Sequence, residues 1–436
     1  MRQRRFLLLP LVLAGCTIYV GPYDDEPGET ANQGGEVVSP EEAQQAREAE
    51  AWSYTANVIY KGAEILYSYE LPSGDIVDFV NRDTLPAVYE LPELPFALEL
   101  PPGVELGLTE IEQIPELLDL TLIATPFHRP TFWPYILGET DATSIEDYLA
   151  RYQVPGQLQA TAERLYAGLH SLQPNRGISG YVNQFRPEVE EDTFSLIEFA
   201  VACPLKGPIQ EQIGVVLSVD KANKFDKKNP QKLVDNELRL HIEYLRPNSA
   251  GQVVGVWDGR DSQFVDNPIR RHHPGEIVPA SVLDETMVEH LLAIFQAPVT
   301  GDWWIAYNGD LLGYYPASLF KLLNGGACRS AWYAEVAKVT SPKRDGWIPG
   351  WNMTMGSGEF AEAGLLNAAH VRDPKHYDLT WAGVPPTEDP PFSLAAKPNK
   401  PLCYNRSKLT HIPAPWDSTF IFLGGPGGKN PGCTWP

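Results

Sequence analysis

The feature of the sequence that most limits its fold is a series of short apolar runs that begins near Gly177 and continues to the C-terminus. The runs have the length of β-strands and are bounded by glycine, proline, asparagine or aspartate: FSLIEFAVA, IGVVLSV, RLHIEYL, DWWIAY, AWYAEVAKV and STFIFL. In RLHIEYL, polar Arg239, His241 and Glu243 alternate with apolar residues, which predicts an antiparallel strand with one face in water. We therefore expect a mainly β protein whose C-terminal part is an antiparallel β-sandwich.

The part of the chain before Gly177 has a mixed character. Residues 157–172 read QLQATAERLYAGLHSL, and their apolar residues recur at intervals of three and four, which predicts a helix. Residues 84–120 are rich in leucine, proline and glutamate. Because proline lacks a backbone donor and biases the residue before it towards extended geometry, we expect an extended arm there.

The N-terminus, MRQRRFLLLPLVLAGC, has a basic start, a short apolar run and small residues before Cys16. This pattern predicts a secretory signal at 1–15 that is too short to span a membrane. The ending LAGC resembles the lipobox of bacterial lipoproteins, which implies a lipid on Cys16, a tether at 16–38 and an outer-membrane location. The alternative is an apolar leader that is not cleaved.

Charge limits the partners of this chain. Its net charge is −22, and loss of a leader with three arginines and no acid leaves 31 basic against 56 acidic residues, or −25. Such a surface repels phosphate backbones, so we expect no nucleic-acid partner and contact with a membrane only through the lipid. We expect no metal or other cofactor, because His272-His273 and His241-x-Glu243 lack metal-ligand spacing and read as surface residues.

Four cysteines remain after Cys16. An even number in an exported protein predicts two disulfides, for which three connectivities are possible. We favour one disulfide that holds the C-terminus and one that joins the two other cysteines: Cys403–Cys433 and Cys203–Cys328.

Several motifs occur in one order along the C-terminal part: RGISGYVNQF, GDWWIAYNG, GYYPASLF, WYAEV, MGSGEF and FLGGPGGKNPGC. Together they resemble the C-terminal domain of the neprosin family of peptidases, over residues 177–436. The resemblance implies a jelly-roll-like sandwich and a glutamic peptidase that cleaves after proline. It divides the chain at 175/176 into an activation-peptide-like region, 39–175, and a neprosin-like domain, 176–436.

The resemblance also implies the catalytic residues. The family's W-G-G-E-V motif corresponds to 332–336, so that Glu335 is the first catalytic glutamate. The family's second glutamate falls at Gln212, with Glu211 beside it. Because side chains alternate along a strand, Gln212 shares a polar face with Gly214, whereas Glu211 shares the apolar face, and we favour Gln212 over Glu211. A Gln/Glu pair resembles that of fungal glutamic peptidases.

Other residues are candidates for contacts with a peptide or protein substrate, in particular a proline-rich one. Trp303, Tyr314, Tyr315 and Glu359 are the candidates, and for each the structural alternative is a packing aromatic or a solvated loop acid. The proline-rich arm at 92–104 is a candidate inhibitor of the same groove. Two rival functions stay open: a sandwich that binds peptides or glycans without cleaving them, and a glycosidase, since paired carboxylates and tryptophans also suit sugars.

Overall fold

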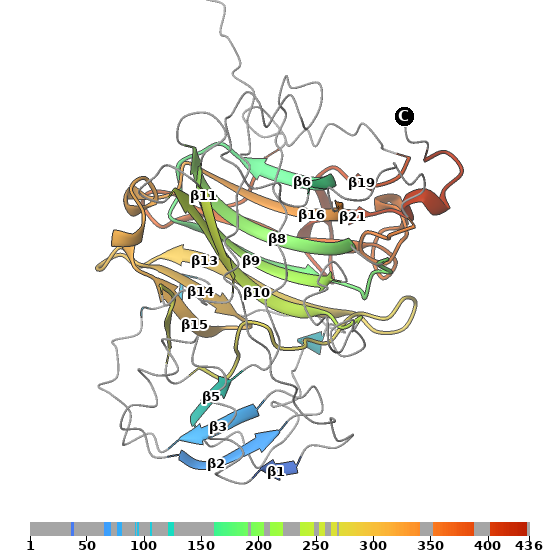
Figure 1. Cartoon of the computed structure of the whole chain (residues 1–436). Coiled ribbons are helices and arrows are strands. Elements are labelled where there is room, and N and C mark those ends of the chain that lie inside the picture. The colour runs from blue at the N-terminus through green and yellow to red at the C-terminus, as the bar shows by residue number, and fades with distance from the viewer. Residues whose placement is uncertain are drawn as a thin grey trace, which may run out of the picture.

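The computed structural model describes the strands β1 to β5, residues 92, 94 and 95, and most of the chain from 161 to 433. The described ranges in that last part are 161–190, 193–204, 210–220, 236–247, 253–257, 263–267, 270–340, 352–387 and 402–433. Within them the protein is mainly β, and its main sheets are antiparallel, as the sequence predicts (Figure 1).

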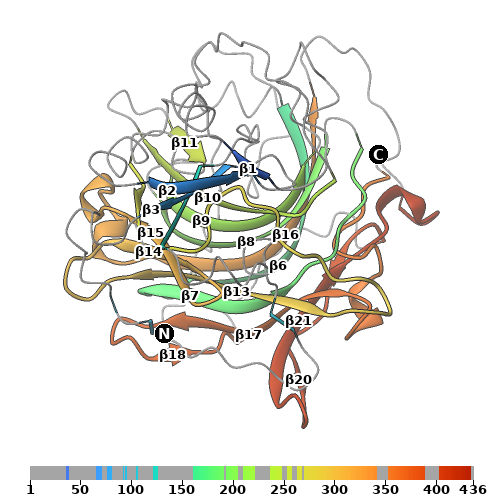
Figure 2. The same cartoon turned by 90° about the horizontal axis from the view of Figure 1, so that it is seen from below.

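One sheet has six long strands in the order β11-β10-β9-β8-β16-β6. These strands are β6 (Thr161–Ser171), β8 (Thr193–Pro204), β9 (Gln210–Asp220), β10 (Arg239–Pro247), β11 (Val253–Trp257) and β16 (Arg329–Thr340). In Figure 2 the long strands curve, and their hollow side faces away from the second sheet.

The second sheet has eleven strands, and its main path runs β12-β15-β14-β13-β7-β17-β21-β19. These strands are β7 (Gly177–Asn183), β12 (Val265–Asp266), β13 (Val288–Gln296), β14 (Trp303–Tyr307), β15 (Asp310–Tyr315), β17 (Ala369–Tyr377), β19 (Asn405–Arg406) and β21 (Ser418–Gly424). Three short strands join it off this path: β4 (Glu105–Leu106), β18 (Gly383–Val384) and β20 (Thr410–Ile412).

A small four-stranded sheet lies at one end of the sandwich, below β15 in Figure 1. It is built from β1 (Glu36–Val38), β2 (Ile65–Glu70), β3 (Ile76–Val80) and β5 (Thr121–Thr125). Four short 3₁₀ turns complete the described elements: Ala317–Leu319, Leu323–Gly325, Ala361–Ala363 and Gly427–Lys429.

The main core fills the space between the six- and eleven-stranded sheets. Trp332 of β16 packs edge-to-face against Phe199 of β8, with ring centroids 6.5 Å apart, and its indole N–H donates to the carbonyl of Ser179 in the facing sheet. The alternate residues of each strand enter this core, as in Ile197, Phe199 and Val201 of β8. The intervening residues of the six-stranded sheet therefore lie on its hollow outer face.

The predicted helix at 157–172 is wrong, because this segment forms β6. Its backbone pairs with β16 along eleven residues, from Thr161↔Thr340 to Ser171↔Ser330. Ala167 and Leu169 are buried in the core, and this spacing of two is a strand pattern that the helical spacing masked. Pairing with β16 outweighs the local helix propensity. The sandwich thus begins before the expected boundary at 175/176.

Two further expectations about burial are wrong. The polar face of β10 is not in water: His241 and Glu243 are 1% and 4% exposed. His272 and His273 are also fully buried rather than on the surface. The Nδ1 atom of His272 is 2.8 Å from Oε1 of Glu276.

The arm upstream of β4 does not lie on the hollow face where it is described. Leu94 packs against a cluster on the outer side of the eleven-stranded sheet that includes Phe295 and Trp304, and β4 pairs in parallel with β13 of that sheet. Residues 96–104 of the arm lie outside the described residues, and its role as an inhibitor stays a prediction. The disulfide prediction is confirmed, since Cys203 is bonded to Cys328 and Cys403 to Cys433.

Candidate active site

Acidic and amide side chains gather on the hollow face of the six-stranded sheet. Glu198 lies on β8 between two core residues, and Tyr333 of the neighbouring strand β16 pairs with it in register. On the other side of β8, Gln212 belongs to β9 and Glu243 to β10. Four adjacent strands thus bring these side chains to one place, although they are up to 135 residues apart in sequence.

Hydrogen bonds hold this cluster together. The side-chain amide of Gln212 donates from Nε2 to Oε1 of Glu198, at 3.0 Å, and to Oε1 of Glu243, at 2.8 Å. The hydroxyl of Tyr333 donates to the other oxygen of Glu198. Glu198 therefore lies at the centre, with an amide on one side and a phenol on the other.

Two glycines make room for these side chains. A Cβ at Gly214 would lie 2.6 Å from Oε1 of Glu198 and 2.7 Å from Cγ of Glu243, so the two carboxyl groups occupy the space above this residue. A Cβ at Gly168, across from Tyr333, would lie 2.4 Å from the Tyr333 Cβ. Both glycines act through the absence of a side chain.

Burial sets the electrostatics of the cluster. The pKa of Glu198 is raised well above its ordinary value, mainly because burial disfavours the charged form, and then by the charge of Glu243 and a hydrogen bond with it. The hydrogen bond from Tyr333 opposes this shift. The pKa of Tyr333 is also raised, first by burial and then by the charges of Glu198 and Glu335. Glu198 thus holds its proton at a higher pH than an ordinary glutamic acid.

Glu335 lies on the same face as this cluster. It is two residues after Tyr333 on β16, it is 1% exposed, and its charge raises the pKa of Glu198. Gln212 pairs in register with Ala202 of β8 and Glu335 with Leu196, so the two residues favoured from the sequence flank Glu198 at positions six residues apart along that strand.

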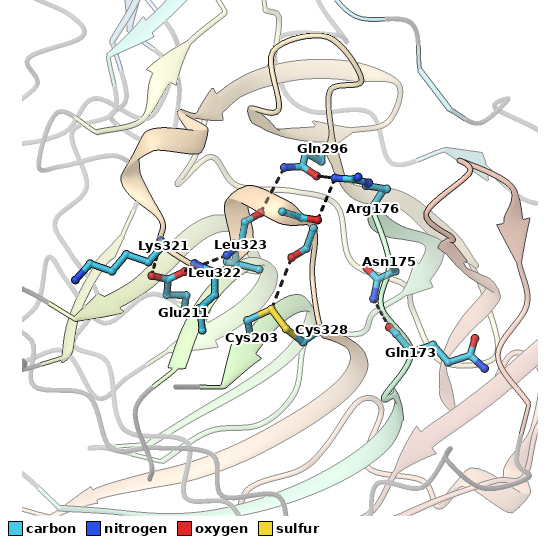
Figure 3. The surroundings of a disulfide bond; sticks show 12 residues. Gln173, Asn175, Arg176, Cys203, Glu211, Gln296, Lys321, Leu322, Leu323 and Cys328 are labelled. Atoms are coloured by element: carbon cyan, nitrogen blue, oxygen red, sulfur yellow. Dashed lines mark hydrogen bonds between the residues drawn. A yellow bond between two sulfur atoms is a disulfide. The ribbon is translucent and has the colours of Figure 1, made fainter. Parts of the chain in front are cut away.

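Glu211 lies outside the cluster, on the other face of β9. Its carboxylate accepts three backbone N–H groups, from Lys321 at 2.8 Å, Leu322 at 2.7 Å and Leu323 at 3.0 Å. Figure 3 shows these bonds close to the disulfide between Cys203 and Cys328. The role of Glu211 in this structure is to hold the loop before β16.

The four candidate substrate residues do not lie on the hollow face. Trp303 and Tyr315 are fully buried in the core between the sheets. Tyr314 packs against Trp304 on the outer side of the eleven-stranded sheet, with ring centroids 4.8 Å apart. Glu359 is an exposed loop acid. In the structure the three aromatic residues are packed against other side chains and Glu359 is a solvated loop acid.

Sequence reasoning missed Glu198, Glu243 and the part played by Tyr333. The signal was present: Glu198 is the single acid of the run FSLIEFAVA, as Glu335 is of AWYAEVAKV. An ionisable residue in a strand that buries both faces needs a partner, and that requirement could have pointed to both glutamates.

Among the described residues, no three His, Cys, Asp or Glu side chains come together in a way that could hold a metal ion. The same residues contain no helix with the length and apolar character needed to cross a membrane.

Buried carboxyl and amide groups thus lie on the hollow sheet of an antiparallel β-sandwich. The neprosin family model matches residues 227–426, so the chain carries a neprosin domain. The match includes β10 and β16, with Glu243 and Glu335, whereas β8 and β9 lie before it.

Solved structures with a similar arrangement are distant. SCP-B, a member of the Eqolisin family of peptidases, in a complex with a tripeptide Ala-Ile-His, is 8% identical over 60% of this chain and 98% of that chain, with a TM-score of 0.28. Scytalido-glutamic peptidase with a peptide-based transition state analog is 7% identical over the same shares, with a TM-score of 0.27. A glycoside hydrolase family 16 endo-glucanase from Bacteroides ovatus is 9% identical over 43% of this chain and 74% of that chain, at 0.25. At these TM-scores the likenesses carry no argument about function.

Proposed function

We propose that this protein is a glutamic-type peptidase in which Glu335 and Gln212 act on the peptide bond. The observation that carries the proposal is that both residues act on the buried Glu198 on the hollow face of one sheet, Gln212 through a hydrogen bond and Glu335 through its charge. The neprosin domain supports the same reaction class.

The chemistry follows from the groups present. Glu335 takes a proton from a water molecule, whose oxygen attacks the carbonyl carbon of the peptide bond. Before substrate binds, the Gln212 amide donates to Glu198 and Glu243, and one of these N–H groups turns to donate to the oxyanion that forms. Glu335 then returns the proton to the leaving amine as the carbon–nitrogen bond breaks. The products are a carboxylic acid and an amine, and the two side chains are restored.

Access is part of the proposal. Glu198, Gln212 and Glu335 are at most 2% exposed in the complete chain. A peptide therefore reaches Glu335 only in a state of the protein in which this face is accessible. We propose that the mature enzyme favours acid pH and cleaves after proline.

The test compares Glu335→Gln with Glu359→Gln, which makes the same chemical change in the exposed loop acid. Both variants and the wild-type chain are incubated with a proline-rich peptide library from about pH 2 to pH 7, before and after limited proteolysis. We expect loss of at least a hundredfold in kcat/KM for Glu335→Gln, because removal of a general base has an effect of this size. The control keeps wild-type activity.

Equal cleavage by Glu335→Gln and the wild-type chain would overturn the proposal. Retention of peptides without cleavage under every condition would indicate the binding alternative, and release of sugars from glycans would indicate a glycosidase. Cleavage at residues other than proline would refute only the specificity.

Export and lipid anchoring are proposed on the LAGC sequence before Cys16. The cysteine thiol is the atom that would carry the lipid, so Cys16→Ser expressed in a bacterial host is expected to leave the membrane fraction. Membrane retention of the variant equal to that of the wild-type chain would refute the anchor.

A further inference from the structure

We propose that Glu198 and Glu243 share a single proton, and that this pair, oriented by Gln212, positions the site around Glu335 and sets the upper pH limit of activity. The inference rests on the proposed function for its catalytic consequence, whereas the shared proton rests first on the geometry.

The first argument is the bridging amide. One nitrogen of Gln212 donates to an oxygen of Glu198 and to an oxygen of Glu243. Two carboxyl groups that accept from the same nitrogen are close enough to repel each other strongly when both are charged, and like charges at this range cannot both ionise near neutral pH. A proton between them removes the repulsion.

The second argument is the space above Gly214. A Cβ at this position would contact both Glu198 and Glu243, so the backbone of β9 leaves a gap that the two carboxyl groups fill together. Both groups are nearly fully buried, at 2% and 4% exposed. Two unprotonated carboxylates in such a place would be costly, since burial penalises each charge.

The third argument is the opposing effects of the neighbours on Glu198. Burial and the charge of Glu243 raise its pKa, whereas the hydrogen bond from Tyr333 lowers it. Glu198 is thus the member of the pair that holds the proton, which it donates to Glu243. Among the described side chains, the other titratable and charged groups that share this face by register are Asp220 of β9, Arg239 and His241 of β10, and Arg329, Tyr333 and Glu335 of β16.

The consequence for catalysis is a charge effect on Gln212 and Glu335. With one proton on the pair, Glu198 is neutral beside Glu335 and adds no negative charge near the oxyanion. When the pH rises through the pKa of Glu198, the pair gains a second negative charge, which disfavours the oxyanion and draws the Gln212 amide away from it. Activity therefore falls on the alkaline side, and Glu198 and Glu243 are positioning residues.

The test follows the carboxyl groups directly. Isotope-edited infrared spectra of the full-length chain, with labelled glutamate, distinguish a protonated carboxyl from a carboxylate. We expect a protonated band that persists at pH 7 and is absent in Glu198→Gln. Glu243→Gln is expected to lower the titration midpoint by about one pH unit or more, because it removes a charge that opposes ionisation. Tyr333→Phe is expected to raise the midpoint, because it removes a hydrogen bond to the charged form.

The same variants are then assayed on peptides. The alkaline limb of the pH profile is expected to move with the infrared midpoint, to lower pH for Glu243→Gln and to higher pH for Tyr333→Phe, while Glu359→Gln leaves both unchanged. Circular dichroism confirms that each variant is folded, and if Glu198→Gln fails to fold, the opposite shifts of the other two variants still decide the matter.

The absence of a protonated band at pH 7, or midpoints that do not move in opposite directions, would overturn the shared proton. Infrared shifts without any peptidase activity would leave the shared proton supported and would refute the proposed function instead. Infrared shifts with an unmoved alkaline limb would overturn the catalytic consequence.

Discussion

At the scale of single residues, the structure assigns opposite roles to two adjacent acid and amide positions. Glu211 accepts three backbone N–H groups and supports the fold, whereas Gln212 joins two carboxyl groups on the hollow face. Because strand geometry sends neighbouring side chains to opposite faces, a change at one position need not affect the other.

Gly214→Ala is expected to separate activity from stability. The added Cβ would lie 2.6 Å from Oε1 of Glu198 and 2.7 Å from Cγ of Glu243, which are side-chain atoms, so these two side chains move while the strand stays paired. We expect at least a tenfold loss in kcat/KM with about 1 kcal/mol or less of destabilisation. Urea unfolding and peptide assays measure the two effects, and a variant with full activity would contradict the tight packing described here.

His290 is expected to make the protein less stable in acid. Burial lowers its pKa from an ordinary 6.5 to about 4, and it lies between the Tyr307 hydroxyl and the carbonyl of Pro279. The unfolded chain binds a proton near pH 6.5 and the folded chain only near pH 4, so this contribution is complete above pH 6.5 and is lost as the pH falls to 4. At 1.36 kcal/mol for each pH unit, the loss is about 3 kcal/mol.

The measurement is the free energy of unfolding at pH 7.5 and pH 4.5 for the wild-type chain and for His290→Gln, which does not titrate. We expect the variant to be less stable at the higher pH but to lose less stability between the two pH values. Equal losses would show that His290 does not titrate on unfolding.

At the scale of elements, β6 is the strand that differs most from the prediction made from the sequence. It closes the six-stranded sheet at the edge beside β16, which carries Tyr333 and Glu335. It also comes from sequence that looked like a helix in the upstream region. The candidate site therefore depends on a strand that precedes the family match.

Leu169→Ala tests the place of β6. Leu169 is fully buried in the main core, so we expect the variant to lose about 2–5 kcal/mol of stability. Leu172→Ala is the control, because Leu172 is 39% exposed just after the strand and its loss is expected within about 0.5 kcal/mol. Chemical unfolding of both variants gives the comparison, and equal small losses would mean that β6 does not pack as described.

The strand patterns in the sequence predicted most of the fold and half of the candidate site. The alternation of side chains along a strand predicted that Gln212 lies on the face opposite the apolar residues of β9, and the structure agrees. The alternation holds because β9 pairs with β8 and β10 without a register shift. The same reasoning failed at 157–172, where the apolar residues fit both a helical and a strand pattern. Only pairing with β16 decides between helix and strand there. This reasoning also could not find the Glu198–Glu243 contact, since nothing local relates β8 to β10 across β9.

At the scale of the whole molecule, one loop joins the two main sheets. The backbone N–H groups of 321–323 donate to Glu211 in the six-stranded sheet. The carbonyls of the same turn accept from Gln296, Trp303 and Arg176 in or beside the eleven-stranded sheet. Figure 3 shows how Glu211, Arg176 and Gln296 surround this turn next to the disulfide.

Glu211→Ala is expected to weaken the connection between the two sheets without abolishing peptidase activity. Three backbone N–H groups lose their charged acceptor, which is expected to lower the free energy of unfolding by about 2–4 kcal/mol. Folded protein should keep its activity, because Glu211 lies on the face opposite Gln212. The exposed acid Glu359→Ala is the control, and a Glu211→Ala variant that is stable but inactive would contradict this division of roles.

The connection at 321–325 also bears on how the sandwich moves. The backbone amides of this turn contact one sheet and its carbonyls the other, and Cys203–Cys328 lies beside them. Slow separation of the two layers would then be restrained at this end and would start at the far end of the strands. Amide hydrogens nearest the loop should exchange most slowly, and protection should decrease with distance along β8 and β16.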